Sequence, residues 1–215
     1  MTQTARADTS DRITGQVLLP NVPWQTYLSL LDGVGDHPIR LTYDRGMLEI
    51  EVPSLHHERL KKFAAQLVEA SLIKMGVDYE PVESATWRLE QELRGLEPDE
   101  CYYIQNAARV RGKTELDVKT DPPPDLAIEI DVTSSSLDKL GLYRAMRVPE
   151  IWRRLPDGRI EIHIRRADGS YAQSAGSAVL PLITTEVLDR FFALREIKGH
   201  AAALREFRSQ VLYKQ

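Results

Sequence analysis

Three consecutive prolines and the eight residues after them constrain this 215-residue chain more than any other feature. Pro122-Pro123-Pro124 does not fit inside a helix, because proline lacks an N–H donor and biases the residue before it toward an extended conformation. The segment that follows, 125–132, reads DLAIEIDV and alternates between acidic or small and apolar side chains. We therefore predict a β-strand over 125–132.

The predicted strand has two different faces, because successive side chains point to opposite sides. One face holds Asp125, Ala127, Glu129 and Asp131. Carboxylates that share a face repel one another and resist burial unless a cation compensates them. Mg²⁺ or Mn²⁺ would compensate an oxygen-rich site of this kind. The alternative is a solvent-facing edge strand with hydrated carboxylates.

Helix and strand signals elsewhere predict a mixed α/β (α+β) protein. Ser54 is suited to cap a long helix that ends at Gly76. Helical patterns cover 23–31, 54–75 and 136–146 and begin again near 184, and β-prone segments cover 39–52, 77–82, 85–89, 100–104 and 150–165. With hairpins near both ends of this series, we expect a mixed β-sheet flanked by helices.

Composition and charge exclude several classes of protein. The chain contains 28 Lys plus Arg, 32 Asp plus Glu and one cysteine, Cys101, which we expect to be buried. One cysteine excludes an internal disulfide framework. No apolar run reaches the length of about 18 residues that a membrane span needs, and residues 1–12 lack the apolar stretch of a secretory signal. We expect a cytoplasmic protein with no membrane partner.

The chain shows no internal repeat and no Gly/Ser linker that would divide it. We predict a mobile leader over 1–12, a single domain over 13–198 and a C-terminal helical tail over 199–215.

Four residues outside the strand are candidates for the same site. Asp99 follows a proline and precedes a β-prone segment, and Lys139 lies near the start of the next helix. Glu58 and His57 lie in the first turns of the long helix. Each has a plainer interpretation: a turn residue for Asp99, a solvated lysine for Lys139, a surface acid for Glu58, and a packed or capping histidine for His57.

The order of these segments resembles a known family. The chain is similar to the Uma family of putative restriction endonucleases, in the PD-(D/E)XK nuclease-like superfamily. The similar segments are LTYDRGMLEIEVPSLHHERLKK, GLEPDECYYI, PPPDLAIEIDVTSSSLDKLGLYRAMRVPEIW and the following hairpin. The resemblance covers about residues 39–194. It implies a restriction-endonuclease-like mixed sheet flanked by helices.

The resemblance also implies roles for individual residues. Asp99 takes the position of the PD aspartate and Glu129 that of the (D/E)XK acid, and together they would bind Mg²⁺ or Mn²⁺. Asp131 stands where lysine is expected, and Lys139 resembles a relocated lysine. Glu58 is similar to the helical acid that holds metal-bound water. For Asp131, a second metal ligand and a partner for Lys139 remain open alternatives.

Charge is unevenly distributed around the predicted site. Residues 80–138 contain 14 acidic and 6 basic side chains, whereas residues 139–166 contain 8 basic and 3 acidic ones. An acidic centre beside a basic flank suits an enzyme that cleaves phosphodiesters, although the arginines also suit a solvated hairpin.

The resemblance predicts a metal-dependent endonuclease that hydrolyses DNA and forms a homodimer. The main alternative is a module on the same fold that binds nucleic acid or protein with weak or absent catalysis. An oligomerisation role for the C-terminal helices and a phosphodiesterase acting outside nucleic acid are further alternatives.

Overall fold

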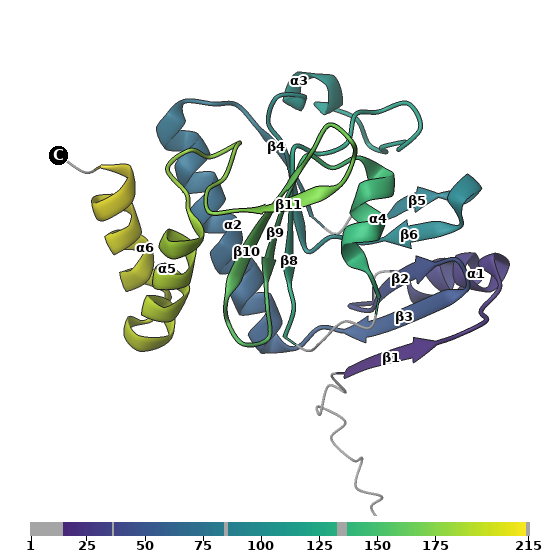
Figure 1. Ribbon diagram of the computed structural model, residues 1–215. Helices are drawn as coiled ribbons and strands as arrows, with labels where there is room; N and C mark the ends of the chain where they lie inside the picture. The colour runs from purple at the N-terminus through teal and green to yellow at the C-terminus, as the bar shows by residue number, and fades with distance from the viewer. Residues whose placement is uncertain (1–14, 36, 84–85, 133–136, 214–215) are drawn as a thin grey trace, which may run out of the picture.

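The computed structural model describes residues 15–35, 37–83, 86–132 and 137–213, which form two β-sheets with helices around them (Figure 1). The predicted mixed α+β class is confirmed. Its strands form two sheets, however, where the sequence indicated one. The predicted leader, 1–12, lies outside the described residues, and so does Ser136, where the helical pattern over 136–146 begins.

The larger sheet is mixed and carries the proline-led strand near its centre. Its strands, in spatial order, are β11 (Tyr171–Ser174), β10 (Ile160–Arg165), β9 (Glu150–Arg154), β8 (Leu126–Ile130), β7 (Glu100–Tyr103) and β4 (Glu80–Glu83). Neighbours are antiparallel except β8 and β9, which are parallel. A parallel pair needs a crossover connection, and helix α4 (Lys139–Met146) supplies it.

The smaller sheet is antiparallel throughout. Its order is β1 (Gly15–Leu19), β3 (Met47–Val52), β2 (Arg40–Asp44), β6 (Arg94–Leu96) and β5 (Trp87–Leu89). Helix α1 (Trp24–Val34) packs Tyr27 on Tyr43 of this sheet, with ring centroids 4.9 Å apart. Gly95 passes so close that a Cβ there would lie 2.0 Å from the Tyr27 hydroxyl oxygen.

Helices cover both faces of the larger sheet. Besides α1 and α4, the described residues form the helices α2 (Leu55–Met75), α3 (Ala107–Val110), α5 (Thr185–Lys198) and α6 (His200–Phe207). Two short turns, a 3-10 turn at Glu90–Glu92 and a π-turn at Arg208–Leu212, are also helical. One core joins α2, α5 and α6 to the sheet, and α4 builds a second core on the opposite face (Figure 1). No helix in the described ranges is long and apolar enough to cross a membrane.

The two-faced strand is confirmed, and its edge-strand alternative is wrong. Leu126, Ile128 and Ile130 enter the core beneath α2, while Ala127 packs on the opposite side with α4. Every residue of β8 is buried, because β7 and β9 flank it and helices cover both faces. The carboxylates on this strand therefore need partners from the protein or a ligand.

Helix α2 begins and ends where its sequence signals indicate. The Ser54 side chain accepts a hydrogen bond from the His57 N–H at 3.1 Å, and Gly76 adopts the left-handed conformation at the C-terminus. Helix α4 differs from the prediction, since it begins at Lys139 with Asp138 as its cap. Short strands β1, β6 and β11 were not predicted, and α1 extends three residues beyond the expected 31.

The C-terminal helices pack into the main core. Gly199 interrupts them, with φ at 85°, and α6 then places Ala203 and Phe207 in the core beside α2. The proposed boundaries of the domain, 13–198, and of the tail, 199–215, stay predictions. Cys101 is buried as predicted, and burial raises the pKa of its thiol.

We predict that Ser54→Ala lowers the free energy of unfolding by about 1 kcal/mol, because the first turn of α2 loses its cap. Urea denaturation measures this change. Ser29→Ala is the matched control, since its exposed hydroxyl only donates back to the Gln25 carbonyl. Equal losses in the two variants would contradict a capping role.

Candidate active site

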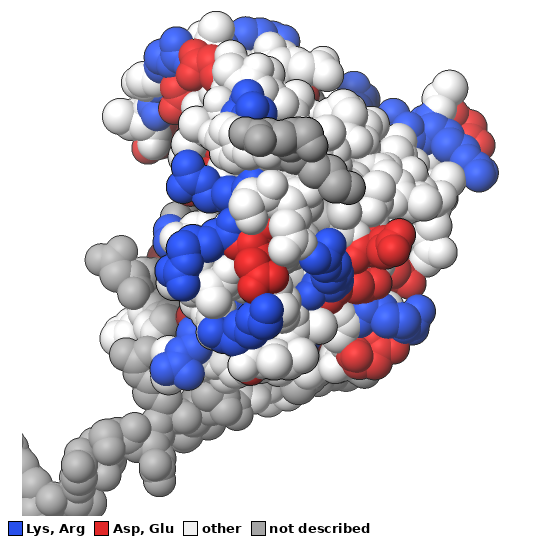
Figure 2. Space-filling model, turned by 90° about the vertical axis from the view of Figure 1, so that its left-hand side faces the viewer, with Lys and Arg blue, Asp and Glu red and all other residues white. Residues whose placement is uncertain are grey.

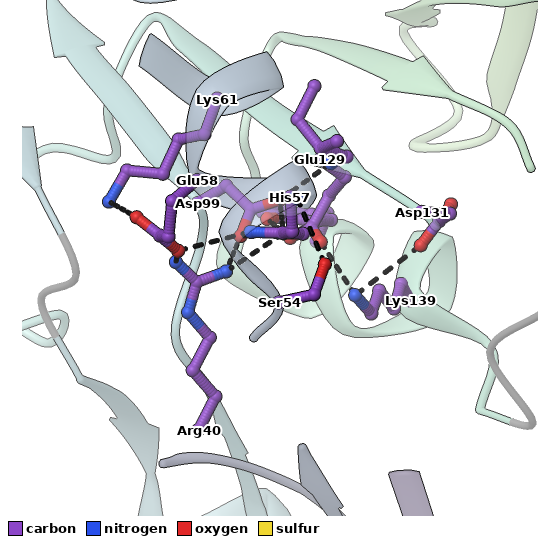
Figure 3. A network of polar contacts seen from close by, with 11 residues as sticks. Arg40, Ser54, His57, Glu58, Lys61, Asp99, Glu129, Asp131 and Lys139 are labelled. Atoms are coloured by element: carbon purple, nitrogen blue, oxygen red, sulfur yellow. Dashed lines mark hydrogen bonds and ion pairs between the residues drawn. The ribbon is translucent and has the colours of Figure 1, made fainter. Parts of the chain in front are cut away.

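The candidate site lies where β7, β8, α2 and α4 meet (Figure 3). β7 and β8 pair with Glu100 opposite Ile128, and continuing this register by one residue places Asp99 opposite Glu129. Side chains directly opposite one another in an antiparallel pair have Cβ atoms about 4.5–5.5 Å apart. Asp99 and Glu129 are only 2% and 1% exposed, so this end of the strand pair carries two buried carboxylates from distant segments.

Asp99 is held from three directions. The Ile130 N–H donates to Asp99 Oδ2 at 2.6 Å, and His57 Nε2 lies 3.1 Å from the same oxygen. Arg40, at the start of β2, forms an ion pair with Asp99. Arg40, His57 and a main-chain N–H therefore satisfy this buried carboxylate.

Glu129 is held by two residues of α4. Lys139 Nζ donates to Glu129 Oε2 at 2.7 Å, and the Tyr143 hydroxyl donates to Glu129 Oε1. Lys139 and Tyr143 are four residues apart and therefore lie on the same side of the helix. The crossover helix between β8 and β9 thus folds its first turns back onto the strand that precedes it.

Lys139 also faces Asp131, with its Nζ 3.6 Å from Asp131 Oδ1. Burial alone would lower the pKa of Lys139, but the charges of Glu129 and Asp131 outweigh this effect and hold it above its usual value. On its other side Asp131 accepts from Arg153 Nη2 at 2.6 Å. Lys139 is therefore an ammonium at neutral pH, with no tendency to act as a base.

Glu58 lies at the open side of the site, with 45% of its side chain exposed. Its carboxylate is 3.1 Å from His57 Nδ1 and 3.7 Å from Lys61 Nζ. The hydrogen bond with His57 is the largest influence that lowers the pKa of Glu58 to about 2. A cavity of about 170 Å³ opens here, lined in part by Arg40, Glu58 and Lys61.

All five sequence-predicted site residues, Glu58, Asp99, Glu129, Asp131 and Lys139, lie in one region. Asp99, Glu129, Asp131 and Lys139 form one buried network, and Glu58 joins it through His57 (Figure 3). The described residues contain no group of three or more His, Cys, Asp and Glu side chains arranged to hold a metal ion.

Sequence reasoning missed two of the contacting residues, Arg40 and Tyr143, and left His57 with a plainer interpretation. Tyr143 is four residues from Lys139, a spacing that indicates a shared helix face. His57 was interpreted as packed or capping, yet both of its ring nitrogens face carboxylates. Arg40 carries no local signal, because it reaches Asp99 from a hairpin far away in the chain.

Comparisons with known proteins give one family and one fold. A family model named Uma2 and described as "Putative restriction endonuclease" matches residues 24–192. A crystal structure of a putative nuclease belonging to DUF820 from Anabaena variabilis has the same fold, with a TM-score of 0.52 and 13% sequence identity. The match covers 79% of this chain and 98% of that one. No curated protein matches.

Proposed function

Because the chain belongs to the Uma2 family of putative restriction endonucleases, we propose that it is a metal-dependent endonuclease that hydrolyses DNA phosphodiester bonds. One observation carries the proposal. Asp99 and Glu129 are both buried, Asp99 accepts the N–H of Ile130, the residue after Glu129, and the Lys139 ammonium lies 2.7 Å from Glu129. Buried acids with a lysine beside them suit chemistry on a charged phosphate.

The donor set suits a hard divalent cation. Mg²⁺ is usually bound by one or two carboxylates together with waters and substrate phosphate oxygens. Asp99 and Glu129 would supply two carboxylates, and the adjacent carbonyl of Ile130 a main-chain oxygen. When bound, Mg²⁺ or Mn²⁺ polarises the scissile phosphate and lowers the pKa of a water.

The chain's own residues would prepare this site. Lys139 stays cationic and stabilises negative charge that develops on the phosphate. Tyr143 fixes one Glu129 oxygen, so that the carboxylate keeps its orientation. Glu58, ionised at neutral pH and open to the cavity, is suited to accept a hydrogen bond from an attacking water.

We predict that Glu129→Gln and Asp99→Asn each slow Mg²⁺-dependent nicking of supercoiled plasmid by about 10³-fold, because each removes a hard anionic ligand. Calorimetry with Mn²⁺ should show binding to the wild type and none to either variant. Glu161→Gln is the matched control, since Glu161 pairs with His163 outside the site. Thermal unfolding of each variant verifies that it is folded.

Wild-type protein that binds Mn²⁺ without nicking would favour the second candidate, a nucleic-acid-binding module with weak or absent catalysis. One observation favours this candidate: protein donors already engage both carboxylates, with Arg40, His57 and Ile130 on Asp99 and Lys139 on Glu129. Nicking that survives Glu129→Gln would contradict the proposed endonuclease site. The homodimer and the cytoplasmic location stay predictions.

A further inference from the structure

Arg40 reaches the candidate site from the smaller sheet and faces two acids at once (Figure 3). Its Nη1 forms the ion pair with Asp99, and its Nη2 lies 3.5 Å from Glu58 Oε1. The Asp99 side chain is 2% exposed, whereas that of Glu58 is 45% exposed and lines the cavity of about 170 Å³. The guanidinium therefore lies between a buried carboxylate and an open one, with a different terminal nitrogen facing each.

The Asp99 carboxylate already has three partners. Its Oδ2 accepts the Ile130 N–H at 2.6 Å, and His57 Nε2 lies 3.1 Å from both of its oxygens. Arg40 pairs with its Oδ1. Since a carboxylate offers about four lone-pair sites, these contacts occupy both oxygens. A divalent cation that takes Asp99 as a ligand therefore has to displace one of the three partners.

Of these partners, Arg40 is the one with a second acceptor. The Ile130 N–H belongs to the main chain of β8, between two paired strands. His57 is 1% exposed, and its own N–H is fixed by the Ser54 side chain at 3.1 Å. The Arg40 side chain instead lines the cavity, beside the open acid. A guanidinium and a divalent cation on one buried carboxylate repel each other with little screening, so Arg40 is the partner that leaves.

We propose that Arg40 competes with the divalent cation for Asp99, and that binding of the cation transfers the guanidinium to Glu58 and the cavity. The inference rests on the proposed function, because that function supplies the cation. The competition is reciprocal: the cation weakens the contact of Arg40 with Asp99 by the same factor by which Arg40 weakens binding of the cation. Arg40 thereby neutralises a buried acid while no cation is bound, and it sets how tightly the cation is held.

Calorimetry with Mn²⁺ at constant ionic strength tests the competition. Arg40→Met should bind Mn²⁺ about tenfold more tightly than the wild type, which is within the usual range of coupling between two ligands. Arg40→Gln should also bind more tightly, and its amide still donates to Asp99 if the methionine variant does not fold. A purely structural role predicts the opposite sign, because a damaged site binds Mn²⁺ more weakly. Thermal unfolding without Mn²⁺ verifies that each variant is folded.

The wild type gives a measurement that needs no variant. Titration with Mg²⁺ should move the Nε–H resonance of Arg40 in the NMR spectrum, because the cation releases this side chain from Asp99. The resonance of Arg94 should stay in place, since Arg94 lies in the same sheet but pairs with Asp44 at 3.0 Å, outside the site. An Arg40 resonance that stays in place while Mg²⁺ binds would overturn the competition.

Arg94→Met is the matched control for the calorimetry, because 17% of its side chain is exposed, against 11% for Arg40. A second control comes from the face that α5 and α6 form, where Lys and Arg gather around a smaller group of Asp and Glu (Figure 2). Arg205→Gln removes one exposed positive charge from α6. Both controls should bind Mn²⁺ as the wild type does.

The outcomes separate this inference from the proposed function. Binding of Mn²⁺ by the Arg40 variants that is equal to or weaker than that of the wild type would overturn the competition and leave the proposed metal site standing. Equally tight binding by a control would also overturn it, because net charge would then explain the effect. Binding by Arg40→Met without binding by the wild type would support the competition and contradict the metal-dependent function. No binding by any of the proteins would overturn both.

Discussion

Lys139→Met is expected to lower the free energy of unfolding by about 3–5 kcal/mol, measured by urea denaturation at pH 7. The ammonium is buried and lies 2.7 Å from Glu129 and 3.6 Å from Asp131. Methionine fills similar volume but leaves two buried carboxylates with less positive charge. The loss of stability therefore comes from the buried Glu129 and Asp131 carboxylates that remain without their partner, since removing one partner of a buried ion pair is more destabilising than removing both.

The double variant Lys139→Met with Glu129→Gln tests this explanation. Removing both charges should recover much of the lost stability, and a double-mutant cycle measures the coupling. Additive losses would show that packing, and not charge, explains the effect.

The alkaline pH dependence gives a second measurement on Lys139. Its pKa is higher in the folded chain than the usual value near 10.4, so its contribution to stability is complete below about pH 10. That contribution is lost as the pH rises from about 10.4 toward the folded-state pKa. The difference in stability between the wild type and Lys139→Met should therefore narrow across this range. A constant difference would contradict the charge interaction.

Local signals explain what the sequence predicts well. The limits of α2 follow from Ser54 and Gly76, and the faces of β8 follow from strict alternation after three prolines. Glu129 and Lys139 are ten residues apart, so one strand and one tight connection bring them together. The short strand β6, of three residues, carries too few side chains to show a pattern.

Long-range pairing explains what the sequence does not predict. Two sheets form because β2 pairs with β6 and β4 pairs with β7. No local sequence pattern predicts either pairing. Arg40 belongs to the smaller sheet yet neutralises Asp99 beside the larger one. A residue of one sheet that contacts a site beside the other sheet can be recognised only when the strand pairing is known.

Asp125 is a residue whose role the sequence suggests wrongly. Alternation along the strand places its side chain on the same face as Glu129 and Asp131, although it does not join their contacts. Its Oδ2 accepts from the N–H groups of Ile104, Gln105 and Asn106 at 2.7, 2.9 and 3.3 Å. The carboxylate is 4% exposed and organises the turn after β7. Alternation alone does not distinguish an acid that binds backbone amides from one that faces a ligand.

Asp125→Ala is therefore expected to lower the free energy of unfolding by about 3 kcal/mol, because three part-buried backbone N–H groups lose a charged acceptor and a hydrogen bond to a charged group contributes about 1.5–3 kcal/mol. Asp125→Asn keeps one carbonyl oxygen and should lose less. Asp168→Ala is the control, an exposed aspartate that accepts the Ser170 N–H at 2.8 Å, and it should lose less than about 1 kcal/mol. Urea denaturation compares the three, and equal losses in Asp125→Ala and Asp168→Ala would contradict the explanation that the Asp125 carboxylate stabilises this turn. Mn²⁺ binding by folded Asp125→Asn should equal that of the wild type, since Asp125 contacts the turn and not the Asp99 and Glu129 pair.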